Sequence, residues 1–112
     1  MSNLTEKGVL PIGVEYQGAM HREFELRPLK MKDSFNIKNR PYAEKAQENS
    51  EYMGLCMFAA RLEKLGDIPK EAITPELLLE AYDDDMAVIM AADERIKKNL
   101  KSLKTQSGVT ES

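Results

Sequence analysis

Residues 10–29, LPIGVEYQGAMHREFELRPL, predict a β-hairpin, and this hairpin decides the fold class. Apolar and polar side chains alternate with a period of two on both arms, as in strands with one buried face. The expected apolar face consists of Ile12, Val14, Tyr16, Met20, Phe24 and Leu26. Gly18 accepts a positive φ without steric cost, so the turn is expected at residues 17–19. Pro28 lacks an N–H and disfavours a helix at Arg27, so the second strand should end there.

The composition is that of one small domain. The chain has 112 residues, and 42% of them are hydrophobic, which is enough for a core. The net charge of −3 predicts no overall attraction to nucleic acid or to an anionic membrane. The single cysteine excludes an intrachain disulfide and a multi-cysteine metal site. No apolar run approaches the roughly 20 residues that span a bilayer, and no signal-peptide core is visible. We therefore expect a cytosolic protein.

Helical periodicity follows the hairpin. Helices are expected at about residues 31–38, 51–65, 75–82 and 85–103. The predicted fold is α+β, a single domain at residues 9–104 in which the hairpin packs on three or four helices. Residues 42–50 are polar and fit either a loop or a short helical turn. The polar segments 1–8 and 105–112 are expected to be disordered.

Capping residues support these boundaries. Asp33 or Ser34 could cap the first helix, and Ser50 the second. Gly66 is expected at the position just after the end of the second helix. Thr74 followed by Pro75 is a strong helix start. The acidic run at residues 83–85 is expected to begin the last helix, where carboxylates favour the positive end of the helix dipole.

No catalytic, cofactor or metal site emerges from the sequence. His21 is the single histidine, on the polar side of the hairpin, and is interpreted as a surface residue. Cys56 lies in the most apolar helix and is interpreted as a buried small hydrophobe. The acidic run 83–85 lacks the spacing and glycine of a calcium-binding loop, and glycine-rich phosphate-binding loops are absent.

Methionines on two predicted helices form the candidate partner-binding surface. Met53 and Met57 are four residues apart on one helix, and Met86 and Met90, with Ile89, repeat this spacing on another. These side chains fit an ordinary core. They also fit an adaptable surface that holds an apolar helix of another protein, because methionine is flexible and polarizable.

Short motifs over about residues 10–100 resemble the tail assembly chaperones of Mu-like and P2-like contractile-tailed phages and prophages. In the first half these motifs are Leu10, Pro11, residues 13–16, Gly18, His21, Arg22, Phe24, residues 26–29, Lys32 and Asp33. In the second half they are residues 59–62, Leu65, Gly66, residues 73–76, Leu78, Asp84 or Asp85, Ala91 and Ala92.

The resemblance implies a non-enzymatic morphogenesis protein that needs no cofactor. Such chaperones bind the tape measure protein, a long and largely helical apolar chain, and keep it soluble until tail tube subunits polymerise around it. They act in the host bacterial cytoplasm and are absent from the mature virion. Many of their genes also encode a longer form made by ribosomal frameshifting. The resemblance therefore predicts the tape measure protein as client, with tail tube subunits and a longer form of the chain as further partners.

Three alternatives stay open at this stage. The chain could be a small prophage DNA-binding or regulatory module, because residues 74–103 superficially resemble a helix-turn-helix; the acidic run at the start of its second helix argues against this. It could also be a permanent structural component of the tail, or, more remotely, an enzyme. The unpaired edges of a hairpin invite pairing between chains, so the sequence allows a homo-oligomer.

Overall fold

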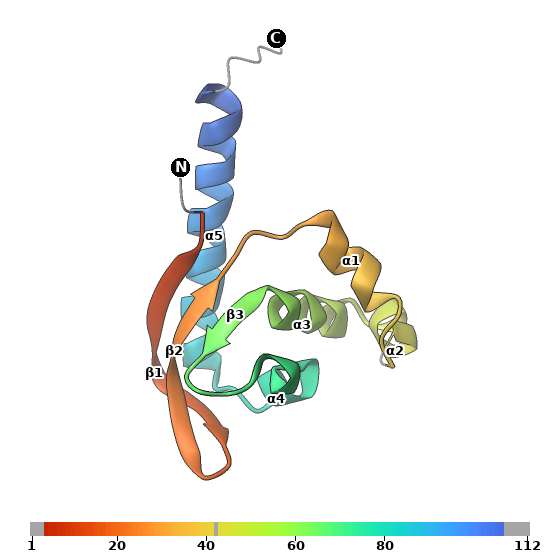
Figure 1. Cartoon of the computed structure of the whole chain (residues 1–112), viewed down its shortest axis with the longest axis vertical. Coiled ribbons are helices and arrows are strands. Elements are labelled where there is room, and N and C mark those ends of the chain that lie inside the picture. The colour runs from red at the N-terminus through yellow and green to blue at the C-terminus, as the bar shows by residue number, and fades with distance from the viewer. Residues whose placement is uncertain (1–3, 42, 107–112) are drawn as a thin grey trace.

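The computed structural model describes residues 4–41 and 43–106 and has the predicted α+β fold (Figure 1). A β-hairpin comes first, helices follow, and one further strand lies between them. The elements are β1 (Glu6–Tyr16), β2 (Ala19–Leu26), α1 (Met31–Ile37), α2 (Ala43–Glu48), α3 (Ser50–Arg61), β3 (Leu62–Leu65), the 3₁₀ helix η1 (Lys70–Ala72), α4 (Pro75–Leu79) and α5 (Asp83–Gln106).

The hairpin is longer than predicted. β1 and β2 are antiparallel and are joined by Gln17 and Gly18, which have φ angles of 52° and 80°. Two consecutive positive φ angles match the right-handed twist of the flanking strands. Because β1 already begins at Glu6, the prediction that residues 1–8 are disordered is wrong for residues 6–8. Residues 1–3 lie outside the described ranges.

A large irregularity interrupts the pairing of β1 with β2. Val9 pairs with Glu23 and Val14 pairs with His21, so β1 has four residues where β2 has only Arg22. The Nε–H of Arg22 fills part of this gap by donating to the carbonyl of Leu10 at 2.8 Å. The extra residues disrupt the simple alternation of buried and exposed side chains along β1.

Asp85 of α5 secures the other side of this bulge. Its two carboxylate oxygens accept hydrogen bonds from the N–H groups of Ile12 and Gly13, each at 2.8 Å. Gly13 has a φ of 108°, and a Cβ added there would lie 2.8 Å from the side chain of Arg22. Ile12 is consequently exposed, as is Met20 near the turn, so the prediction that both lie on the buried face is wrong.

A third strand replaces the end of a predicted helix. α3 ends at Arg61, and β3 pairs antiparallel with β2, which gives a sheet with the strand order β1-β2-β3. The prediction of a helix at residues 51–65 is therefore wrong for its last four residues. Gly66 follows the strand, not a helix, and takes the left-handed conformation with a φ of 56°.

The helix starts agree only in part with the predicted caps. Thr74 accepts from the N–H of Leu77 and caps α4, as predicted. In α3 the capping side chain is Asn49 rather than Ser50, because Asn49 accepts from the N–H groups of the second and third residues that follow it. Neither Asp33 nor Ser34 precedes α1. Asp33 lies inside the first turn and accepts from the N–H of Lys30.

α5 is longer than predicted at both ends. It begins at Asp83 rather than residue 85 and runs to Gln106, so residues 105 and 106 are helical rather than part of a disordered tail. Residues 107–112 lie outside the described ranges. α4 is shorter than predicted and ends at Leu79. No described helix has both the length and the apolar content that crossing a membrane requires.

Two apolar clusters hold the fold together. The larger lies between the sheet, α4 and α5, which packs along β1 (Figure 1). The smaller lies among α1, α2 and α3, on the other side of the sheet's third strand (Figure 1). The buried residues of the smaller cluster are Ile37, Ala46, Tyr52 and Cys56.

Candidate functional site

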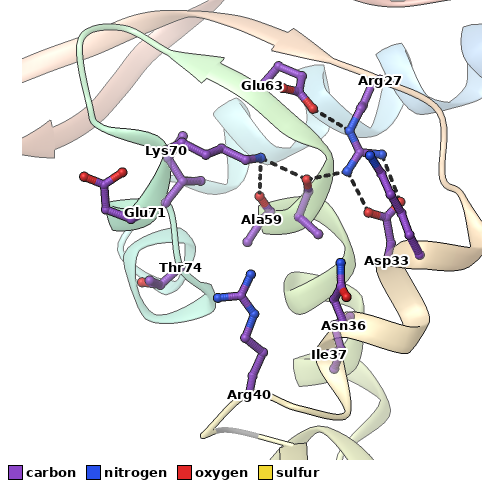
Figure 2. Close-up of a pocket in the computed structure, with 13 residues that line it drawn as sticks. Arg27, Asp33, Asn36, Ile37, Arg40, Ala59, Glu63, Lys70, Glu71 and Thr74 are labelled. Atoms are coloured by element: carbon purple, nitrogen blue, oxygen red, sulfur yellow. Dashed lines mark hydrogen bonds and ion pairs between the residues drawn. The ribbon is translucent and has the colours of Figure 1, made fainter.

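An arginine at the end of β2 organises the junction between the sheet and α1. Arg27 forms a two-pronged ion pair with Asp33, in which Nη2 donates to Oδ1 at 2.6 Å and Nη1 donates to Oδ2 at 2.9 Å (Figure 2). The Nε of Arg27 donates to Glu63 of β3, and Nη2 also donates to the carbonyl of Ala60. Paired, planar contacts of this kind fix orientation as well as adding energy.

Asp33 is buried, with 2% of its surface exposed, and depends on this arginine. The hydrogen bonds from Arg27 hold the pKa of Asp33 below its usual value, although burial alone would raise it. The same contact raises the pKa of Arg27. Because Asp33 also accepts from the N–H of Lys30, the ion pair fixes the start of α1 relative to the sheet.

Lys70 of η1 completes the junction from the opposite side. Its Nζ donates to the carbonyl of Leu62 at 2.6 Å. It also donates to the carbonyls of Ala60 at 2.9 Å and Ala59 at 3.5 Å, where α3 ends (Figure 2). A cation at the negative end of a helix satisfies carbonyls that have no helical partner. Burial lowers the pKa of Lys70.

These groups border a pocket of about 280 Å³ between α1, α3 and η1 (Figure 2). Most of its charged side chains are engaged with one another or with backbone carbonyls. The hydroxyl of Thr74, on the pocket wall, is occupied as the cap of α4. The pocket therefore holds a structural network, and its paired groups position α1 rather than offer a free nucleophile with an adjacent base.

The outer side of α1 is unexpectedly apolar. Met31 is 87% exposed and Phe35 is 69% exposed, and the two are four residues apart, so they are neighbours on the helix surface. Leu29, just before the helix, is also exposed. We call Leu29, Met31 and Phe35 the α1 patch. Large apolar side chains exposed together are a feature of interaction sites, whereas single exposed ones are ordinary.

The residues predicted to bind a partner do not form one surface. Met53 and Met57 are half-buried against the smaller cluster, whereas Met86 is half-buried against the larger one. Ile89 has no exposed surface, so the prediction that it contacts a client is wrong for this structure. Only Met90 is well exposed, at 54%.

The other side chains considered from the sequence have structural partners. Nδ1 of His21 accepts from the N–H of Asp67 at 3.0 Å, and its ring meets the ring of Tyr16 edge-on. Cys56 is buried as predicted, and burial raises the pKa of its thiol. Within residues 4–41 and 43–106, no group of three or more histidine, cysteine or acidic side chains could hold a metal ion.

Sequence reasoning missed both Asp85 and the α1 patch. Asp85 looks like its exposed neighbours Asp83 and Asp84 in a run of three acids, and only the fold brings it to the bulge of β1. The α1 patch did leave a signal, because Met31 and Phe35 share the four-residue spacing that drew attention to methionines elsewhere.

Comparison of the chain with models of known protein families, with curated proteins and with solved structures found no match.

Proposed function

We propose that this protein is a non-enzymatic chaperone of tail assembly, which binds the tape measure protein and keeps it soluble in the host cytoplasm. The observation that carries the proposal is the α1 patch, where Met31 and Phe35 project away from the body of the protein. A holdase for a helical apolar client needs such a surface, and an amphipathic client helix recognises exposed apolar side chains at helical spacing.

The way α1 is mounted supports a binding role for the patch. Asp33 and Ile37 face inward, where the arginine pair and the smaller cluster hold them, so Met31 and Phe35 are directed outward. A short helix of seven residues would not hold this orientation alone, because isolated helices of this length are unstable in water. The Arg27–Asp33 pair thus presents the patch on a fixed support.

Charge elsewhere on the molecule suits a protein that must stay soluble while it exposes apolar surface. Charged residues make up 31% of the chain. This combination fits the resemblance to tail assembly chaperones noted in the sequence. The proposal places the primary client site on the α1 patch, in preference to the predicted set that included Ile89. Contacts with tail tube subunits and with a longer form of the chain belong to the same proposal.

The test is co-expression of the tagged chain with the tape measure protein encoded beside it. We expect the two proteins to co-purify and the tape measure protein to move from the insoluble to the soluble fraction. Phe35→Asp should abolish both effects. Met90→Asp is the matched control, because Met90 is an exposed apolar residue on α5, outside the α1 patch.

Circular dichroism and thermal melting would establish that both variants are folded. If the wild-type chain neither co-purifies with the tape measure protein nor solubilises it, the proposed function is wrong. If Met90→Asp fails and Phe35→Asp succeeds, the chaperone function stands and the client site lies on α5.

A further inference from the structure

We infer that the α1 patch selects clients by charge, and that it binds amphipathic helices whose apolar face is flanked by acidic residues. The inference rests on the proposed function and specifies the class of client segment. Its basis is that exposed basic side chains lie next to the exposed apolar side chains of Met31 and Phe35.

The segment that contains the α1 patch is basic, as are residues 95–104 of α5, which hold five basic and no acidic residues. Residues 29–40 contain four basic residues and one acidic residue, a net charge of +3 in a chain whose total is −3. The remainder of the chain therefore carries −6. The four basic residues are Lys30, Lys32, Lys38 and Arg40, and all are exposed. Such local excess attracts a segment of opposite charge and steers its approach.

The acidic residue of this segment does not neutralise it. Asp33 is buried and its carboxylate is occupied by Arg27, so the exposed charges of residues 29–40 are all positive. Among the described residues, Lys32 and Lys38 have no carboxylate within the 4.0 Å of an ion pair. Their charges are therefore available to a partner.

The positions of these lysines match the flanks of a docked helix. Lys32 lies three residues before Phe35, and Lys38 lies three residues after it, so both neighbour Phe35 on the surface. Lysine stems pack along apolar surface while the ammonium groups reach outward. A client helix with its apolar face over Met31 and Phe35 would meet Lys32 and Lys38 at its margins, where glutamate or aspartate gives complementary charge.

A protein segment suits this surface better than an anionic membrane or a nucleic acid. Both of those present extended negative charge, which the −6 on the rest of the chain would oppose. A single helix contacts only the area near α1. A client helix also covers the side chains of Met31 and Phe35, which the phosphates of a nucleic acid would leave exposed.

Two synthetic amphipathic peptides with the same leucine-rich face would test the inference, one flanked by glutamates and the other by lysines. Fluorescence anisotropy with the full chain should show the glutamate peptide binding about tenfold more tightly at low salt. This preference should largely disappear near 1 M salt, where the screening length falls to about 3 Å. Phe35→Asp should weaken binding of the glutamate peptide, because it removes apolar contact and adds a like charge.

Charge reversal provides the decisive comparison. The double variant Lys32→Glu with Lys38→Glu should prefer the lysine peptide. Lys7→Glu with Lys98→Glu is the matched control, because it changes the net charge equally at exposed positions on β1 and α5, and it should keep the original preference.

The outcomes separate this inference from the proposed function. Equal binding of the two peptides by a chain that still solubilises the tape measure protein would overturn the inference alone. Binding to vesicles of phosphatidylglycerol, lost in the Lys32 and Lys38 double variant, with neither peptide bound, would assign the patch to a membrane. Concentration-dependent dimerisation that Phe35→Asp abolishes, again without peptide binding, would assign it to a second copy of the chain.

Discussion

One carboxylate holds the distorted part of β1. Asp85 is fully buried and accepts two backbone hydrogen bonds from residues more than 70 positions away in the sequence. At the bulge, four residues of β1 lie opposite one residue of β2, so regular strand pairing cannot supply hydrogen-bond partners for all their backbone groups. The carboxylate of Asp85 supplies acceptors for two of the N–H groups. Its exposed neighbours Asp83 and Asp84 only favour the start of a helix, as predicted for the whole run.

Asp85→Ala should lower the free energy of unfolding by about 3 kcal/mol, because two buried N–H groups lose a charged acceptor. Asp84→Ala, the control at an exposed position, should cost no more than about 1 kcal/mol through the helix dipole. Urea unfolding followed by circular dichroism measures both. Equal losses in the two variants would mean that the carboxylate of Asp85 acts only at the helix start.

At the scale of elements, β3 is the strand that sequence reasoning did not find. Leu62 and Leu65 are three residues apart and continue the helical pattern of α3, and leucine, glutamate and lysine all favour helices. Pairing with the edge of β2 overrides that local preference. Lys70 helps by binding the carbonyls of Ala60 and Leu62, where α3 gives way to the strand.

Gly66 tests this interpretation of β3. Gly66→Ala should lower the free energy of unfolding by about 2 kcal/mol, because alanine disfavours the positive φ there and its Cβ would collide with the ring of His21. Gly54→Ala is the opposite control. It lies inside α3 with nothing within 4 Å of an added Cβ, so it should raise stability by about 0.5–1 kcal/mol.

Thermal or urea unfolding of the two alanine variants gives the comparison directly. A neutral Gly66→Ala would show that the turn after β3 can relax. If Gly66→Ala is destabilising, the double variant Gly66→Ala with His21→Gly, compared with His21→Gly alone, separates backbone strain from collision, because glycine at position 21 removes both the Cβ and the ring that the added Cβ would meet.

Local patterns predicted the parts of the fold that are local in sequence. The hairpin, the start of α4 at Thr74 and the burial of Cys56 each follow from residues close together in the chain. The bulge, β3 and the arginine pair depend on contacts between distant segments, which alternation and periodicity do not encode. The same limit explains the client site: Ile89 and Met90 are adjacent in sequence, yet only the packing of α5 on β1 decides which one is exposed.

For the whole molecule, the division of the core into two clusters implies unequal local stability. The smaller cluster contains four buried residues and belongs to α1, α2 and α3. Its helices are short, apart from α3, and the Arg27 network ties them to the sheet. Regions with few buried apolar contacts open more easily than the main core.

Hydrogen exchange should therefore show weaker protection of α1 and α2 than of β2 and the sheet-facing part of α5. The thiol of Cys56 gives a second readout, because burial blocks its reaction until the smaller cluster opens. Arg27→Ala should speed both exchange in α1 and labelling of Cys56 by several-fold or more. Uniform protection across both clusters, unchanged by Arg27→Ala, would contradict the prediction.

The link between Asp85 and β1 also has a consequence for how the chain is made. A ribosome releases the two arms of the hairpin early, whereas Asp85 emerges only after α1, α2, α3, β3 and α4 have been synthesised. Until then the amides of Ile12 and Gly13 have water as their partner in place of a carboxylate. The bulge of the nascent hairpin therefore lacks these two hydrogen bonds, and β1 gains them only when α5 packs against it.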